Sequence, residues 1–213
     1  MSAIELGIRA GFVAIAVALW FWSQAKISER KAPLPADGGI GDRLHTLTAP
    51  WNAWLAANPR AADKLLIATS AGIDMFAVYL LAAAIFGATT QPLIALVIVF
   101  TLRQLCEMLV ALPEPPGVIW RYPGFPSLLV TYHVENDFFF SGHTAVSVVG
   151  ALQLIHFAPT WVAALAVILA TIEAVTVIVL RAHYTMDVFA AIAAACVADV
   201  AAGRLAPALD SFL

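Results

Sequence analysis

The chain has 213 residues, of which 62% are hydrophobic and 12% are charged, and its formal net charge is -3. The charged fraction is about half that of a typical soluble domain, and several apolar runs reach the roughly 20 residues that cross a bilayer. These values exclude a soluble enzyme and a general nucleic-acid binder. They indicate one domain over residues 1–213 that is embedded in the lipid bilayer.

Six membrane-spanning helices are predicted, so the fold class is all-α, a polytopic six-helix bundle. The predicted spans cover residues 4–22, 64–86, 92–112, 141–157, 160–180 and 187–205. Because the connections after spans two and four are short, each of these spans forms a hairpin with the next. With six spans, the first, third and fifth connections share one membrane face, and they contain every polar motif. Residues 45–63 form either an interfacial helix anchored by Trp51 and Trp54 or an ordered loop.

One polar motif lies at the start of the sixth span and reads His183-Tyr184-Thr185-Met186-Asp187. Its histidine and aspartate are four residues apart, so a helix would place them on one face. A carboxylate that accepts one ring N–H leaves the other ring nitrogen basic, as in an activated nucleophile or base. The alternative is a structural histidine–aspartate pair between two spans.

A second motif, Ser141-Gly142-His143-Thr144, opens the fourth span a few residues after Asp137. Ser141 is a good N-cap, and Gly142 lets the backbone approach a ligand closely. The N–H groups at such a helix start favour an anion such as phosphate, and His143 could protonate a leaving alkoxide. A helix cap alone would explain one motif. Two motifs on one face indicate an active site, because ionisable groups are costly at membrane depth.

Two readings stay open for the charged side chains near these motifs. Arg103 and Glu107 are four residues apart in the third span and can pair with each other, or Glu107 can orient a histidine or a headgroup amine. Arg121 and Arg181 are candidates for charge-assisted phosphate contacts or for interfacial cations.

The remaining ionisable residues give weaker signals. His133 and Glu135 could be two ligands of a metal ion. No further ligands follow at consistent spacing, so no metal and no cofactor are predicted. No specific role is assigned to His45, His156, Asp74 and Glu173, although Asp74 could pair within the bundle.

The motifs together resemble the sphingomyelin synthase family, within the type 2 phosphatidic acid phosphatase superfamily, over roughly residues 5–205. Residues 183–187 match its His-Tyr-Thr-x-Asp motif in full, and residues 141–144 match its Ser-Gly-His-Thr, without the preceding Cys-Gly. Residues 33–37 and 112–117 match its two proline-rich motifs with one residue inserted in each. The Lys-x(6)-Arg-Pro signature of the superfamily's ordinary phosphatases is missing, which favours the synthase-like branch.

The resemblance implies a metal-independent transfer of a phospholipid headgroup in two steps. His183, oriented by Asp187, would attack the phosphorus and form a phosphohistidine. His143 would protonate the departing oxygen and then act as base on the acceptor. Residues expected to support the phosphate site or the histidines are Asp137, Ser141, Gly142, Thr144 and Tyr184.

The identity of the acceptor stays open between ceramide, diacylglycerol and water. A lipid hydroxyl would make the protein a sphingomyelin or ceramide phosphoethanolamine synthase-like enzyme, and water would make it a lipid phosphatase or phospholipase C type hydrolase. A non-catalytic lipid-binding or transport protein is a third alternative. The sequence also leaves open whether the chain forms a homo-oligomer.

Two arguments about orientation disagree. Six basic residues lie in or beside the first connection, on the face that carries the motifs: Lys26, Arg30, Lys31, Arg43, Arg60 and Lys64. The positive-inside rule would place that face in the cytoplasm, whereas the family resemblance places it on the exoplasmic side. The short chain and alanine-rich spans indicate a bacterial inner-membrane protein, and we expect its active site to face the periplasm.

Overall fold

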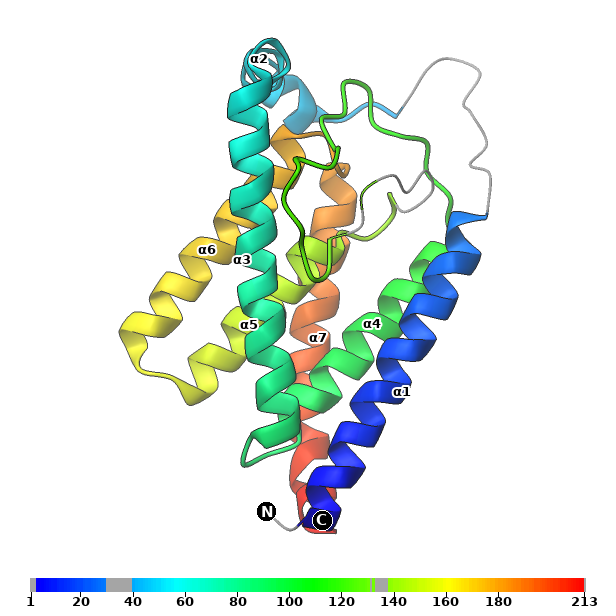
Figure 1. Cartoon of the computed structure of the whole chain (residues 1–213), viewed down its shortest axis with the longest axis vertical. Coiled ribbons are helices and arrows are strands. Elements are labelled where there is room, and N and C mark those ends of the chain that lie inside the picture. The colour runs from blue at the N-terminus through cyan, green and yellow to red at the C-terminus, as the bar shows by residue number, and fades with distance from the viewer. Residues whose placement is uncertain (1–2, 30–39, 131, 133–137, 213) are drawn as a thin grey trace.

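The computed structural model describes residues 3–29, 40–130, 132 and 138–212, and its regular structure there is entirely helical (Figure 1). This confirms the all-α class. The described helices are α1 (Ala3–Ser28), α2 (Arg43–Ala57), α3 (Pro59–Phe86), α4 (Gln91–Leu109), α5 (Gly142–Phe157), α6 (Thr160–Val179) and α7 (Thr185–Asp210).

Five of these helices, α1, α3, α4, α6 and α7, are long and apolar enough to cross a membrane. The structure therefore does not confirm the predicted count of six spans. The difference is α5, which has 16 residues and falls just short of the usual 17 to 25. It packs against α3, α6 and α7, so much of its surface meets protein rather than lipid.

The contacts of α7 with its neighbours depend on small side chains. Ala191, Ala195, Ala198 and Ala202 follow one another at helical spacing and are all fully buried. They belong to the main apolar core with residues of α4 and α5, the two helices that α7 packs on. Small residues let helix backbones approach closely where lipid supplies no hydrophobic driving force between helices.

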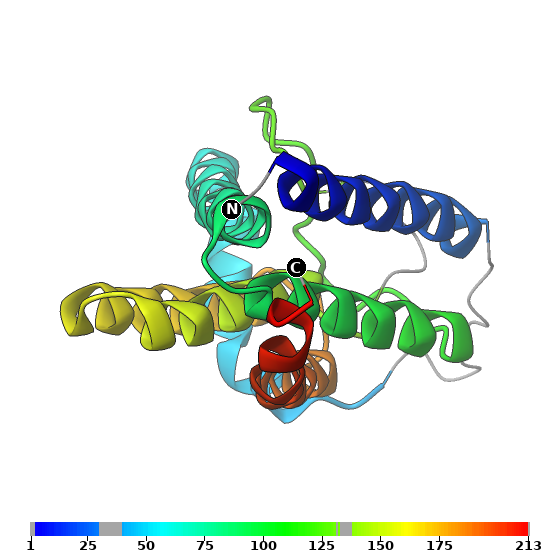
Figure 2. The same cartoon turned by 90° about the horizontal axis from the view of Figure 1, so that it is seen from below.

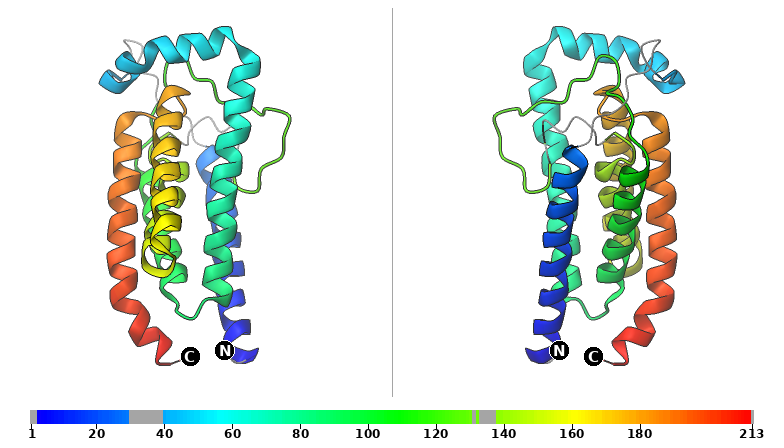
Figure 3. Two further views of the ribbon diagram at one scale, coloured as in Figure 1. Left: turned by 90° about the vertical axis from the view of Figure 1, so that its left-hand side faces the viewer. Right: turned by 90° about the vertical axis from the view of Figure 1, so that its right-hand side faces the viewer.

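Helix α2 lies across one end of the bundle and runs crosswise to α3 (Figure 3). Asp42 caps it by accepting a hydrogen bond from the backbone N–H of His45 at 3.1 Å. Trp51 and Trp54 are 62% and 58% exposed, whereas Leu55 is buried. The segment is therefore a helix with outward-facing tryptophans, as predicted for an interfacial helix, and the loop alternative is wrong.

The first turn of α1 and the last turn of α7 lie at the other end of the bundle (Figures 1 and 2). There Arg9 donates to the carbonyl of Gly87 at 2.7 Å, and the Asp210 carboxylate accepts from the Thr89 hydroxyl at 2.7 Å. His156 Nε2 lies within hydrogen-bonding distance of the Asp199 carboxylate, at 3.0 Å. His156 thus has a structural role between α5 and α7, which the sequence did not predict.

Asp74 and Glu173 are satisfied inside the bundle. Asp74 on α3 accepts from the Ser127 hydroxyl and from the backbone N–H groups of Leu128 and Leu129, at 2.9 to 3.2 Å. Asp74 therefore holds the connection between α4 and α5 against α3. Glu173 on α6 accepts a hydrogen bond from Thr69 on α3, which joins these two helices.

Replacing Asp74 with alanine should release the connection around Leu129. The substitution removes the shared acceptor of three donors, and each lost hydrogen bond typically contributes about 1 kcal/mol. We expect a lower melting temperature in detergent and faster proteolysis between residues 118 and 130. Asp74→Asn, which keeps one carbonyl acceptor, should lie between Asp74→Ala and the wild type. Unchanged melting and proteolysis would contradict this role of Asp74.

Candidate functional site

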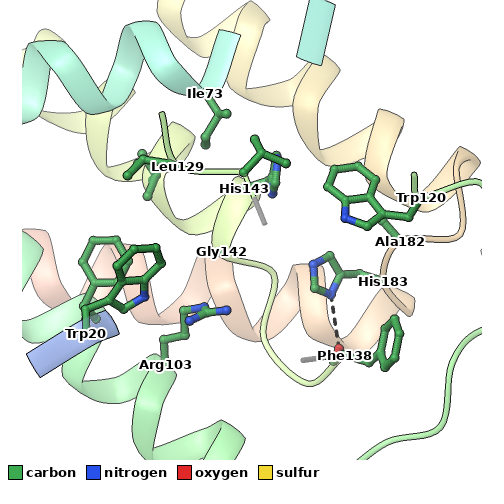
Figure 4. Close-up of a pocket in the computed structure, with 13 residues that line it drawn as sticks. Trp20, Ile73, Arg103, Trp120, Leu129, Phe138, Gly142, His143, Ala182 and His183 are labelled. Carbon is green, nitrogen blue, oxygen red and sulfur yellow. Dashed lines mark hydrogen bonds between the residues drawn. The ribbon is translucent and has the colours of Figure 1, made fainter. Parts of the chain in front are cut away.

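A small cavity of about 80 Å³ lies where α4, the start of α5 and the α6–α7 connection meet (Figure 4). Its polar lining residues are Arg103, His143 and His183, which point into it from three separate elements. Trp20 and Trp120 close it on apolar sides. The two predicted histidine motifs, 40 residues apart in the sequence, therefore meet in one place.

A backbone carbonyl orients the His183 ring. Nδ1 lies 3.2 Å from the carbonyl oxygen of Phe138, and the contact is drawn in Figure 4. A carbonyl can only accept, so Nδ1 carries the proton and Nε2 keeps its lone pair. The ring is thus held in the tautomer that has its proton on Nδ1 and its lone pair on Nε2.

The predicted hydrogen bond between Asp187 and His183 is absent from this structure. His183 precedes α7 rather than lying on it, and its Nδ1 is 3.9 Å from the Asp187 Oδ2, which is beyond hydrogen-bonding distance. The same Oδ2 accepts the backbone N–H of Tyr184 at 2.8 Å and so stabilises the first turn of α7. Asp187 thus lies beside the His183 ring without a hydrogen bond to it.

Asp42 and His45 of α2 fix the backbone around His183. The Asp42 carboxylate accepts the Thr185 N–H at 2.6 Å and the Thr185 hydroxyl at 2.7 Å. His45 Nε2 lies 2.9 Å from the carbonyl oxygen of His183, and its ring stacks on Tyr184 at 5.5 Å. No role had been predicted for either residue. The only signal in the sequence was Asp42 at a helix N-cap position.

Tyr184 lies next to His183 at the start of α7 but does not line the cavity. It is buried, and it belongs to the capping box of α7 rather than to the cavity lining. Burial, together with the nearby carboxylates of Asp187 and Asp42, raises the pKa of its hydroxyl above the ordinary value. Tyr184 therefore stays neutral at physiological pH.

Neither Arg121 nor Arg181 lines the cavity. Arg121 pairs with Asp63 at 2.6 Å and is 43% exposed at its side chain. Arg181 is buried, donates to the backbone carbonyl of His45, and has a φ of 59°. Burial also lowers its pKa below the usual value. Both arginines donate to backbone carbonyls, Arg121 to that of Pro59 and Arg181 to that of His45, and their phosphate contacts stay a prediction.

Arg103 is the guanidinium that reaches the cavity. It pairs with Glu107 at 2.6 Å, as one of the two predicted readings had it, and it donates to the Gln24 side chain at 2.9 Å. Its Nε lies only 3.1 Å from where a Cβ on Gly142 would be. A glycine at 142 therefore allows the guanidinium to pack directly on the start of α5.

Ser141 caps α5 as predicted. Its hydroxyl oxygen accepts the Thr144 N–H at 3.3 Å and the Thr144 hydroxyl at 3.0 Å. The Ser141 N–H donates to the backbone carbonyl of Asp187 at 3.2 Å, which ties the two motifs together. His143 lies edge-on against Trp120, with ring centroids 5.0 Å apart.

The arrangement suits an anion between two imidazoles. A helix start presents N–H groups and partial positive charge, and a guanidinium adds a full charge beside it. Asp137, His133, Glu135 and the proline-rich residues 33–37 lie outside the described residues. Within the described part of the chain, no group of three or more His, Cys, Asp or Glu side chains could hold a metal ion.

The profile of the AtPDCT1/2 family matches residues 42–204, which include every described residue of both histidine motifs. The chain belongs to this family. Over 171 residues it is 25% identical to phosphatidylcholine:diacylglycerol cholinephosphotransferase 1 of Arabidopsis thaliana. That alignment covers 80% of this chain and 56% of the plant protein, so the chain spans little more than half of its relative. No solved structure matches.

Membership of the AtPDCT1/2 family agrees with the predicted resemblance at a coarse level, that of lipid phosphotransferases and their relatives. The relative's name concerns phosphatidylcholine and diacylglycerol, not ceramide.

Gly142→Ala should weaken anion binding in the cavity. The new methyl group would push the Arg103 guanidinium away from the start of α5. We expect orthovanadate, a phosphate analogue, to raise the melting temperature of the wild type, and the variant to bind it about tenfold more weakly, roughly 1.4 kcal/mol. Gly203→Ala is the matched control, because a Cβ there meets nothing closer than 3.9 Å. Equal vanadate affinity in both variants would refute the anion site.

Proposed function

We propose that the protein is a phospholipid headgroup phosphotransferase that moves a phosphocholine-type group from one membrane lipid to the hydroxyl of another. One observation carries the proposal: His143 and His183 line a single cavity together with Arg103 and the start of α5. Family membership and the cholinephosphotransferase relative support the same reaction class.

In the first step, Nε2 of His183 attacks the phosphorus of the donor lipid. A P–N bond forms and the P–O bond to the diacylglycerol oxygen breaks. His143 gives a proton to that departing oxygen, so diacylglycerol leaves as a neutral alcohol. The Phe138 carbonyl holds the nucleophilic tautomer, and the Asp187 charge at 3.9 Å stabilises the positive ring that the step creates.

In the second step, the hydroxyl of the acceptor lipid attacks the same phosphorus. His143 takes the hydroxyl proton, a new P–O bond forms and the P–N bond to His183 breaks. Arg103 and the N–H groups at the start of α5 would stabilise the charge on the phosphoryl oxygens in both steps. These residues need no metal ion for this chemistry.

The walls of the cavity support a lipid acceptor rather than water. Trp20, Trp120 and Phe138 line it beside the two histidines, and such walls exclude water from a reactive phosphohistidine. Diacylglycerol is the acceptor in the relative's name, and ceramide presents a comparable hydroxyl on a two-chain lipid.

Substitution of either histidine should abolish headgroup transfer. We expect His183→Ala to lose at least 10³-fold and His143→Ala about 10² to 10⁴-fold in turnover, the range for a general acid–base residue. The assay uses purified protein, a panel of phospholipids, and fluorescent diacylglycerol or ceramide, with products separated by chromatography. His156→Ala is the control, because His156 is paired with Asp199 away from the cavity.

Two outcomes would change this assignment. Diacylglycerol formed from phospholipid at the same rate without any acceptor would make the protein a hydrolase. If no lipid gave a His183-dependent product while His183→Ala still bound lipid, the protein would be a non-catalytic lipid-binding protein.

We also propose that the cavity faces the exoplasmic side, as the family resemblance implies. The first turn of α1 and the last turn of α7 lie at the end of the bundle away from the cavity (Figure 1). A reporter fused after Leu213 should then be cytoplasmic when the chain is made in a bacterial inner membrane. A periplasmic reporter would show that the positive-inside rule governs instead. The named relative is a plant protein, so a bacterial origin stays a prediction.

A further inference from the structure

A second and larger hollow, of about 480 Å³, lies between α1, α3 and α4. Its volume falls within the roughly 300 to 1,000 Å³ that is usual for ligand pockets. Its walls are almost entirely apolar and include Val13 and Ala16 of α1, Ala77 and Leu81 of α3, and Leu93 and Val97 of α4. We call it the α1–α4 groove.

The α1–α4 groove adjoins the cavity that contains the histidines. Trp20, Phe100, Leu129 and Val146 line both hollows, so the two share a wall. A lipid whose phosphate lay beside His183 would therefore have its chains next to the groove.

The groove also opens toward the bilayer. Val17 and Leu105 line it and are 38% and 49% exposed on helices long enough to span a membrane. A chain from the surrounding lipid could thus enter sideways between α1 and α4.

Two residues of the groove wall have buried polar atoms, and one of them, Trp20, also lines the cavity. The indole N–H of Trp20 and both polar atoms of the Gln104 amide are buried, and no described residue hydrogen-bonds them. Buried polar groups in proteins nearly always have a partner, so such atoms indicate a ligand or water. Two N–H donors beside an apolar groove suit the carbonyl that joins an acyl chain to its headgroup.

We propose that the α1–α4 groove binds an acyl chain of the lipid substrate, with Trp20 and Gln104 recognising the carbonyl at its head. The assignment rests on the proposed function for the identity of the lipid. The chemistry named is an acyl chain with its carbonyl, which donor phospholipid and acceptor diacylglycerol share.

Photo-crosslinking tests the chain position without turnover. The full chain with His183→Ala is placed in nanodiscs containing phosphatidylcholine that has a diazirine at its acyl end, and adducts are mapped by mass spectrometry. We expect labelling of Val13, Ala16 or Leu93 to exceed labelling of Ile168, an outward-facing residue of α6 that is 56% exposed. Ala16→Trp, or Val97→Trp if the former does not fold, should remove these adducts. Equal labelling of the groove and Ile168, or adducts that survive a folded plugging variant, would overturn the proposal.

An ether-linked phosphatidylcholine tests carbonyl recognition, because it lacks the carbonyl oxygen. In competition for the crosslink, we expect the protein with Trp20 and Gln104 intact to bind diacyl lipid about tenfold more tightly than dialkyl lipid. Gln104→Leu should reduce this preference severalfold. Gln91→Leu, at the other end of α4, is the matched control. A preference that is absent, or unchanged in Gln104→Leu, would refute this role.

A third arm compares phosphatidylcholine with diacylglycerol as competitor, which shows whether donor, acceptor or both occupy the groove. If crosslinking succeeds but no headgroup transfer occurs, acyl-chain binding in the α1–α4 groove is supported and the proposed function fails. If transfer occurs but the groove is not labelled, only this inference fails.

Discussion

The two hydrogen bonds from Thr185 to the carboxylate of Asp42 hold together the part of the structure on which the site depends. Helix α6 ends at Val179 and α7 begins at Thr185, so His183 lies in the short connection between them and outside both helices. His45 and Arg181 add further bonds between α2 and this break. Helix α2 thus determines where the His183 imidazole lies relative to the long apolar helices.

The cost of placing ionisable groups near lipid applies at both ends of the bundle. At both ends, several such groups are paired or bound to backbone groups. At the terminal end, pairs such as His156 with Asp199 only join helices. At the cavity end, Arg103 is paired with Glu107 and still faces the open space beside His143 and His183. This difference, rather than the number of charged residues, distinguishes a site from structural pairing.

Local sequence signals predicted much of this arrangement, whereas contacts between distant segments were not predicted. The apolar runs located the long helices, and the Ser141 cap and the Arg103–Glu107 pair were predictable because their partners lie three or four residues away. Asp187 is also four residues from His183, but the expected hydrogen bond between them does not form, because the helix begins only after the histidine. The contacts of His45 and Phe138 with His183 join distant segments through backbone carbonyls, which no residue pattern reveals.

Trapping of a covalent intermediate tests the central claim most directly. The full chain would be mixed with phosphatidylcholine without an acceptor, quenched in alkali and analysed by peptide mass spectrometry. A phosphocholine adduct on His183 that disappears when diacylglycerol is added is the result we expect. Headgroup transfer that proceeds with no adduct, or with an adduct on His143 instead, would contradict the assignment of His183 as the nucleophile.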